Sequence, residues 1–231
     1  MRIAVLSDLH ANLPVAEAAI RQAKDDGCDR IVHLGDAINY GGWPAETLDL
    51  LRNESVECVR GNHDEYPIYG IPEQTRRALS PQRLRQYERT AAALQERHID
   101  QLLSTPLSIE SLIDEWLVRF VHYFVEDGRV SEVPVPSTED ELVKRFAVRP
   151  GEILCFGHSH RKLWSFRGDR AILNPGATGF DDQAVFAVLN VRDIGVWVEW
   201  HQVDVPQIVA TEIESEVPVV KAPIEPVVPV R

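Results

Sequence analysis

The sequence contains no apolar run long enough to cross a lipid bilayer. Near its start, the apolar stretch from Ile3 to Leu6 stops at Ser7 and Asp8, which makes it too short for the core of a signal peptide. We therefore expect a cytoplasmic protein without a membrane partner.

Cysteine is scarce in this chain. Its 3 cysteines, Cys28, Cys58 and Cys155, are widely spaced and lie among apolar neighbours. An odd number of separated cysteines argues against a disulfide framework and against a CxxC site. The pattern is typical of buried, reduced thiols.

The sequence also lacks a cluster of lysine and arginine. Its formal net charge is -12, so its surface repels polyanions, and long DNA or RNA is a poor candidate ligand. A small phosphorylated molecule remains possible, because bound metal cations attract it locally whatever the global charge.

The composition that is present, 44% hydrophobic and 26% charged residues over 231 positions, is typical of a folded globular protein. This length allows one domain with an appendage. We predict a single domain over residues 1–205. The segment 206–231 is rich in proline and valine without a period, which predicts an extended or disordered tail.

Short apolar runs alternate with amphipathic segments in the first part of the chain. The runs from Ile3 to Leu6, Arg30 to Leu34 and Val56 to Val59 predict strands, and the segments after Pro14 and over 45–52 predict helices. This alternation indicates a parallel sheet with right-handed crossovers.

The rest of the chain predicts a helical insertion and then a second sheet. Residues 73–104 are charged and periodic, which predicts one or two surface helices that form a cap-like insertion over the site. Further strands and one helix are expected over 107–113, 116–123, 138–147 (the helix), 153–156, 162–166, 170–173, 184–191 and 196–203.

Polar clusters follow the predicted strands at their carboxyl ends, where open α/β sheets place their ligands. They contain five of the eight histidines and offer oxygen and imidazole donors without thiolates, a set that suits Mn, Fe, Co, Ni or Zn better than Ca or Mg. In chain order the clusters are Asp8-x-His10, Gly35-Asp36, Gly61-Asn62-His63-Asp64, His122 and Gly157-His158-x-His160.

This ordered set of DxH, GD, GNH with an acidic residue, a single His and GHxH resembles the signature of the calcineurin-like metallophosphoesterases. The resemblance extends from Met1 to about Val203. It implies an α/β fold, a four-layer α-β-β-α sandwich of two mixed sheets, with a site for two metal ions at the edge where the strands end.

The resemblance also implies a role for each ligand. Asp8, His10 and His160 are expected to bind the first metal, whereas Asp36 bridges both metals. The expected ligands of the second metal are Asn62, His122 and His158. A lone histidine such as His122 can equally be a buried core residue. The only other histidine that competes with it for this ligand position is His33.

Further roles follow for residues around these ligands. The resemblance makes His63 the acid that protonates the leaving oxygen, which suits its near-neutral pKa, and Asp64 either holds the His63 ring or is a plain turn carboxylate. Asn12 and Arg60 lie close enough to contact a phosphate. The alternatives are a helix cap for Asn12 and a salt bridge for Arg60.

The residues after Asp36 indicate a subgroup. The arginine that protein phosphatases carry shortly after GD is absent, and the Tyr40-Gly41-x-x-Pro44 pattern is similar to that of small bacterial and archaeal phosphodiesterases. The expected function is hydrolysis of small phosphodiesters or nucleotides by attack of a metal-bridging hydroxide on phosphorus, with two divalent ions, foremost Mn²⁺, about 3.5 to 4 Å apart. Alternatives are a protein-binding scaffold on the same fold, a nuclease or a protein phosphatase.

Overall fold

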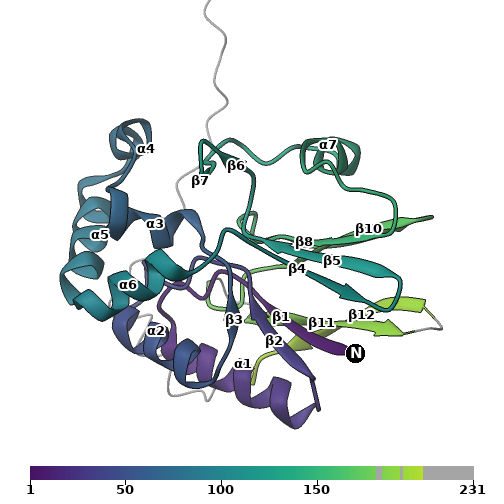
Figure 1. Cartoon of the computed structure of the whole chain (residues 1–231). Coiled ribbons are helices and arrows are strands. Elements are labelled where there is room, and N and C mark those ends of the chain that lie inside the picture. Colours follow the sequence, from purple (N-terminus) through teal and green to yellow (C-terminus); the bar gives the residue numbers. More distant parts are fainter. Residues whose placement is uncertain (181–183, 193–194, 205–231) are drawn as a thin grey trace, which may run out of the picture.

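Two five-stranded sheets pack face to face in the structure, a computed structural model that describes residues 1–180, 184–192 and 195–204 (Figure 1). The first sheet has the order β12-β11-β1-β2-β3. Its strands are β1 (Arg2–Leu6), β2 (Arg30–His33), β3 (Glu57–Cys58), β11 (Val185–Arg192) and β12 (Gly195–Gln202). β1, β2 and β3 are parallel, whereas β11 runs antiparallel to both β1 and β12, so the sheet is mixed.

The second sheet has the order β4-β5-β8-β10-β9 and is also mixed. β5, β8 and β10 are parallel, and the two edge strands are antiparallel to their neighbours. The strands are β4 (Ser108–Ile113), β5 (Trp116–Val121), β8 (Glu152–Cys155), β9 (Lys162–Arg167) and β10 (Arg170–Pro175). β6 (Val125–Glu126) and β7 (Arg129–Val130) form a separate hairpin.

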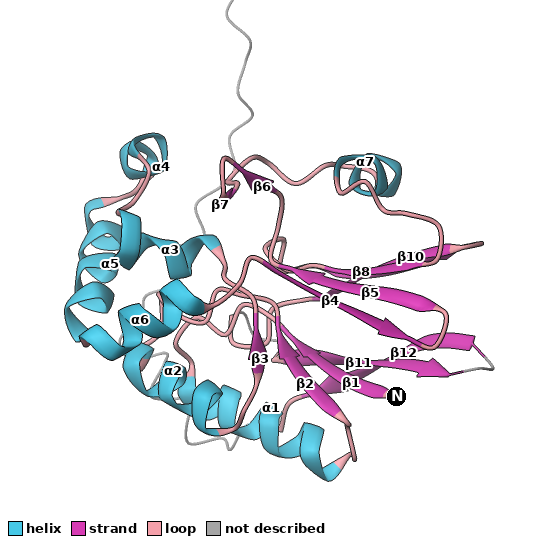
Figure 2. Cartoon of the chain, in the orientation of Figure 1, coloured by secondary structure: helices cyan, strands magenta, loops and turns pink. Residues whose placement is uncertain are grey.

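Helices cover the outer faces of both sheets (Figure 2). α1 (Leu13–Asp25) and α2 (Pro44–Asn53) pack on the first sheet, and each has a proline at its first or second position, where no backbone hydrogen bond is lost. α7 (Glu139–Arg145) covers the second sheet, and its N-cap Thr138 accepts a hydrogen bond from the Glu141 amide.

Alternation along the strands separates three cores. On β1, Ile3 and Val5 point between the sheets towards Val118 and Phe120 of β5, whereas Leu6 faces α1 and α2. A third core lies between the second sheet and α7. The layers therefore follow the order helix, sheet, sheet, helix, which confirms the predicted four-layer sandwich of two mixed sheets.

Three features differ from the sequence-based expectation. The GNHD segment, expected as a loop, starts α3 (Asn62–Tyr69), and residues 125–130 form the unpredicted β6-β7 hairpin. The last two strands do not join the second sheet. They return to the first sheet, where β11 pairs with β1, because its inward side chains complete the core between the sheets.

The charged insertion forms three helices where one or two were expected: α4 (Glu73–Ala78), α5 (Pro81–Ala93) and α6 (Glu96–Ser104). They stack with α3 at one end of the sandwich (Figure 1). The division into a domain over 1–205 with a cap-like insertion stays a prediction. The predicted tail, 206–231, lies outside the described residues.

In the part of the chain that the structure describes, no helix is both long and apolar enough to cross a membrane. The cytoplasmic location stays a prediction from the sequence. All three cysteines are free thiols, as expected, but only Cys155 is fully buried, whereas Cys28 and Cys58 are half-buried.

Candidate metal centre

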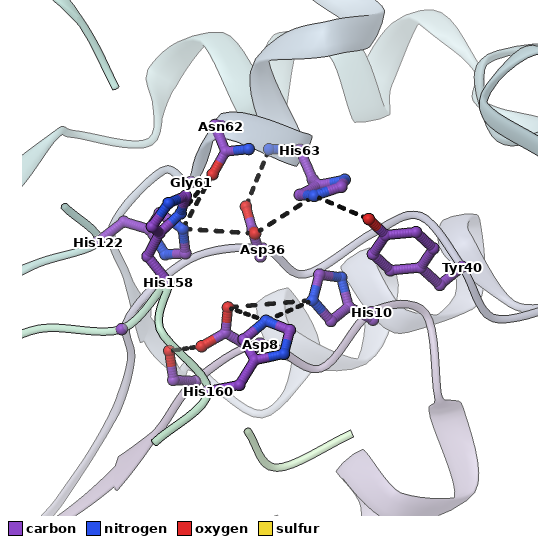
Figure 3. Close-up of polar contacts among 12 residues, drawn as sticks. Asp8, His10, Asp36, Tyr40, Gly61, Asn62, His63, His122, His158 and His160 are labelled. Atoms are coloured by element: carbon purple, nitrogen blue, oxygen red, sulfur yellow. Dashed lines mark hydrogen bonds and ion pairs between the residues drawn. The ribbon is translucent and has the colours of Figure 1, made fainter. Parts of the chain in front are cut away.

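The predicted ligands gather where strands of both sheets end (Figure 3). Asp8 and His10 follow β1, Asp36 follows β2, Asn62 starts α3 after β3, and the three remaining histidines follow β5 and β8. Five of the seven predicted ligands have left-handed backbone angles, with φ between 49° and 65°: Asp8, His10, Asp36, His158 and His160. Such angles are costly outside glycine and cluster at functional sites.

The first ligand group consists of Asp8, His10 and His160, whose donor atoms all lie within 4.8 Å of one another. The His160 Nε2 is 3.2 Å from the Asp8 Oδ1 and 3.3 Å from the His10 Nε2. The other ring nitrogen of His10 faces the Ile38 carbonyl at 3.4 Å. Its Nε2 is therefore left to point into the group, because metal-binding histidines commonly donate their other ring nitrogen to a backbone carbonyl.

The second ligand group consists of Asp36, His122 and His158, with the amide of Asn62 among them. The Asn62 Oδ1 is 3.1 Å from the His122 Nε2 and 3.0 Å from the His158 Nδ1. The Asn62 Nδ2 donates to the Tyr66 hydroxyl at 3.1 Å, which orients the amide so that its oxygen faces the histidines.

His122 shows that this group attracts positive charge. Its Nδ1 lies 2.8 Å from the Leu34 carbonyl, which only accepts, so Nδ1 carries a hydrogen. Its Nε2 then faces two further acceptors, the Asn62 Oδ1 at 3.1 Å and the Asp36 Oδ2 at 3.3 Å. The unprotonated Nε2 and these two oxygens are three acceptor atoms that face one another, and only a proton or a metal cation can satisfy them together.

Asp36 lies between His122 and His63, above the first ligand group (Figure 3). Its Oδ1 accepts a hydrogen bond from the His63 amide at 2.9 Å, and its Oδ2 is 3.3 Å from the His122 Nε2. The carboxylate of Asp36 can lie here because residue 61 is a glycine: a Cβ on Gly61 would lie 2.1 Å from the Asp36 Oδ1. That Asp36 bridges two metals stays a prediction.

The protonation states favour cation binding. Burial alone would raise the pKa of Asp8, but the hydrogen bond and charge of His160 hold it well below its usual range. Burial, followed by the charge of His63, lowers the pKa of His10 to about 3, and burial lowers the pKa of His158 to about 4. The Asp8 carboxylate is thus ionised, and the imidazoles of His10 and His158 are neutral, which is the state in which such groups bind metals.

His122 is the exception. Burial would lower its pKa, but the charge and the hydrogen bond of Asp36 outweigh burial and raise the pKa to about 9. A proton held there occupies the place of a cation among the acceptors described above. The residues of both groups therefore fit divalent metal ions in donor type, charge and arrangement.

His63 is the second residue of α3, and its side chain is largely buried beside Asp36. Its Nε2 lies 3.9 Å from the Asp36 Oδ2 and 3.4 Å from the Tyr40 hydroxyl. Burial lowers the pKa of His63 to about 4, although the charge of Asp36 opposes this. The ring belongs to neither ligand group and faces the site, which agrees with a role outside metal binding.

The expectation that Asp64 holds the His63 ring is wrong. The Asp64 carboxylate accepts hydrogen bonds from the amides of Asp36 at 2.8 Å, Ala37 at 2.9 Å and Gly61 at 2.9 Å. It stands in the first turn of α3, where a carboxylate pairs with free backbone N–H groups. Asp64 thus fixes the backbone that carries Asp36, and it does not reach the imidazole.

Asn12 does not cap α1 through its side chain, although it occupies the N-cap position. Its Nδ2 donates to the Gly179 carbonyl at 3.0 Å, and this contact ties the loop after β10 to the loop after β1. Its buried Oδ1 has no hydrogen-bond partner among the described residues. A phosphate contact of Asn12 stays a prediction.

Arg60 forms a salt bridge, which was the alternative to a phosphate contact. Its Nη1 donates to the carbonyls of Leu102 at 3.2 Å and Leu103 at 3.3 Å, in the last turn of α6. Its Nε lies 3.4 Å from the Glu65 Oε1, and the side chains are only 8% and 2% exposed. These contacts use the guanidinium to join α3 and α6, so the structure does not support the predicted phosphate contact.

We expect Arg60→Met to destabilise the fold by about 1 to 3 kcal/mol, because it removes one of the two arginines that pair with the buried Glu65, the other being Arg129. The KM for a phosphoester should change less than about threefold, since the guanidinium is used elsewhere. Chemical denaturation and steady-state kinetics test both values, with the exposed Arg77→Met as control. A large rise in KM without loss of stability would restore the phosphate contact.

His33, the rival of His122, faces away from the site. Strand alternation on β2 directs Val32 between the sheets and His33 to the helix side, where it lines a small cavity with Leu48 and Leu102. It joins neither ligand group.

Several aromatic side chains lie at the site without a predicted role. The Phe180 ring lies 5.0 Å from the His10 ring and 4.9 Å from the His160 ring, and the Tyr40 ring lies 4.9 Å from the His63 ring. Tyr87, from the insertion, lies 5.6 Å from His63. Only the Tyr40-Gly41 pattern offered a signal in the sequence, because the other two residues reach the site through tertiary packing alone.

Known proteins are similar to this chain over almost its whole length. The chain is 24% identical to the uncharacterised protein MJ0912 of Methanocaldococcus jannaschii, over 94% of this chain and 93% of that protein. The crystal structure of a metallophosphoesterase from Sphaerobacter thermophilus matches with a TM-score of 0.70 and 26% identity, over 94% of each chain. The hypothetical protein PH1004 from Pyrococcus horikoshii matches with a TM-score of 0.72 and 18% identity, over 93% of each chain.

The family profile described as the calcineurin-like phosphoesterase superfamily domain matches residues 1–193, which include every residue of both ligand groups. The chain therefore belongs to the calcineurin-like phosphoesterase superfamily.

Proposed function

We propose that this protein is a metal-dependent phosphoesterase that hydrolyses small phosphodiesters or nucleotides. The observation that carries the proposal is the convergence of acceptor atoms from two ligand groups, Asp8, His10 and His160 on one side and Asp36, Asn62, His122 and His158 on the other. Such a set, without thiolates, suits two divalent ions such as Mn²⁺, Fe, Co, Ni or Zn.

Two bound cations would supply the Lewis-acid chemistry of phosphoester hydrolysis and offset the charge of the phosphate. The chain itself orients these groups. Leu34 and Ile38 carbonyls fix the rings of His122 and His10, and the Asp64 carboxylate fixes the backbone of Asp36. Precise orientation matters, because phosphoryl transfer depends on positioning and electrostatics.

His63 is the proposed proton donor. Water supplies the new oxygen on phosphorus and releases one proton to solvent. The electron pair of the breaking P–O bond stays on the leaving oxygen, which takes a proton from the His63 Nε2. Burial lowers the pKa of His63 to about 4, which by itself opposes this role at neutral pH. A phosphate anion bound beside the ring favours the charged imidazolium and acts in the opposite direction.

The intact ligand groups favour an enzyme over a protein-binding scaffold, since a scaffold has no need of seven convergent donors. The net charge of -12 favours small substrates over long nucleic acids. The helices α4, α5 and α6 carry both arginines and acidic residues on a chain that is acidic as a whole, which argues against a nuclease that binds long DNA.

The test is hydrolysis of bis-p-nitrophenyl phosphate by protein that has been treated with a chelator and reloaded with Mn²⁺ or another divalent ion. We expect turnover only after reloading, and metal analysis should find about two ions per chain. A panel of mononucleotides, dinucleotides and single-stranded DNA then ranks the substrates. Metal-loaded protein that turns over no phosphoester would refute the enzyme and favour the scaffold.

A further inference from the structure

Tyr40 adopts a strained backbone next to the candidate site. Its φ is 67°, and the preceding Asn39 has a φ of 72°. Bulky side chains rarely adopt the left-handed region, and such residues persist where the surrounding structure holds them. The Asn39 Nδ2 donates to the His63 carbonyl at 3.0 Å, and the Gly41 amide donates to the His10 carbonyl at 2.8 Å, so both neighbours of Tyr40 are tied to the site.

This backbone directs the Tyr40 hydroxyl to the proposed acid. The hydroxyl lies 3.4 Å from the His63 Nε2, at the long end of the hydrogen-bond range, and 3.1 Å from the Tyr87 hydroxyl (Figure 3 shows the Tyr40 contact). A chain of three groups therefore runs from α5 through Tyr40 to His63.

The His63 ring has little else to orient it. Its Nδ1 is buried without a hydrogen-bond partner among residues 1–180, 184–192 and 195–204. Its Nε2 is 3.9 Å from the nearest oxygen of Asp36, beyond hydrogen-bond range. Rings of Tyr40, Tyr66 and Tyr87 surround it at 4.9, 5.1 and 5.6 Å, and such packing restricts the ring plane but does not determine which nitrogen faces the site.

Helix α5 holds Tyr40 in turn. The Gln86 side chain donates to the Tyr40 carbonyl, and the Arg83 guanidinium lies over the Tyr40 ring, 4.5 Å from its centroid. Tyr87 is 5% exposed, so its hydroxyl is a fixed partner. The insertion thus contacts Tyr40 through backbone, ring and hydroxyl.

We propose that Tyr40, held by Tyr87 of α5, is a positioning residue. Its hydroxyl holds the His63 ring with the Nε2 towards the candidate site until the leaving oxygen replaces that hydroxyl as the partner of the nitrogen. The inference rests on the proposed function. It gives the helical insertion a role in catalysis, because α5 supplies the support on which the orientation of His63 depends.

Tyr40→Phe is the direct test, since phenylalanine keeps the ring and the backbone requirement and removes only the hydroxyl. The substrates are methyl p-nitrophenyl phosphate and methyl phenyl phosphate, which differ in how much their leaving groups need protonation. We expect kcat/KM to fall about tenfold or more for the phenyl ester and less than about threefold for the p-nitrophenyl ester. A merely structural role would lower both rates equally, and that outcome would overturn the proposal.

A double-mutant cycle tests the part of Tyr87. Tyr87→Phe alone should lower kcat/KM for the phenyl ester about three- to fivefold, and it should lower the rate less than twofold when Tyr40 is already phenylalanine. Fully multiplicative effects would show that Tyr87 does not act through Tyr40.

Tyr69→Phe is the matched control, because this residue lies on α3 with His63 but its side chain is half exposed. It should leave both rates and the melting temperature unchanged. If wild-type protein hydrolyses the p-nitrophenyl ester but Tyr40→Phe leaves the ratio of the two rates unaltered, the inference fails alone. If wild-type protein hydrolyses neither ester nor any other phosphoester, the proposed function fails with it.

Discussion

Asp36→Asn is expected to lower kcat/KM for phosphodiester hydrolysis at least about 10³-fold. Asp36 is the only carboxylate in the second ligand group, so the substitution removes the negative charge of that group. The unchanged expected ligands are one amide, Asn62, and two histidines. Burial would raise the pKa of Asp36, but the charges of His122 and His63 hold it well below its usual value. The carboxylate is therefore ionised at every pH at which the protein is assayed, and asparagine removes a full charge.

The measurement combines steady-state kinetics with metal analysis of the purified protein. Asparagine retains an oxygen that can accept the hydrogen bond from the His63 amide, so the fold should persist and circular dichroism should not change. We expect at least one metal ion fewer per chain. Asp140→Asn, at an 83% exposed side chain on α7, is the control for loss of a carboxylate. Normal metal content with a rate within about threefold of wild type would rule out Asp36 as a ligand.

His63→Gln is expected to lower kcat for phosphoesters with poor leaving groups by about 10² to 10⁴, the usual range for general acid catalysis. Metal content should stay at the wild-type value, because the imidazole belongs to neither ligand group. For a p-nitrophenyl ester the loss should be much smaller, since that leaving group departs without protonation.

The two ester classes and metal analysis together separate His63 from the ligands. A ligand variant should lose metal and activity on both esters, whereas His63→Gln should keep its metal and lose activity on the phenyl ester selectively. His201→Gln, at a partly exposed histidine on β12 that pairs with Asp26, controls for the substitution type. An equal loss on both esters, or a loss of metal, would contradict the assignment of His63 as acid.

The positions of the candidate ligands could be predicted because they depend on local rules. A short apolar run predicts a strand, and a polar residue after it lies at the carboxyl edge of the sheet, where parallel neighbours bring their own ends. This reasoning placed Asp8, His10 and Asp36 correctly at the end of the first sheet and His158 and His160 at the end of the second. The choice of His122 over His33 also follows a local rule, strand alternation, once the register of β2 is known.

The tertiary structure decided the roles of the side chains next to the candidate ligands. Asp64 and Arg60 both adjoin ligand motifs, yet one bonds to backbone amides and the other joins α3 to α6. Nothing in their spacing separates these roles from a catalytic one, because hydrogen-bond partners distant in the chain determine them. The return of β11 to the first sheet is decided in the same way, by burial between the sheets.

By itself, the sequence determined the family, the sandwich of two sheets and the candidate ligands, because each is encoded in a short motif that follows a strand. Only the tertiary structure decided that α5 from the insertion contacts the site and that Tyr40 faces His63. Tyr40 lies 23 positions from His63 and 47 positions from Tyr87 in the sequence. These contacts depend on packing between distant segments, and no local pattern carries that information.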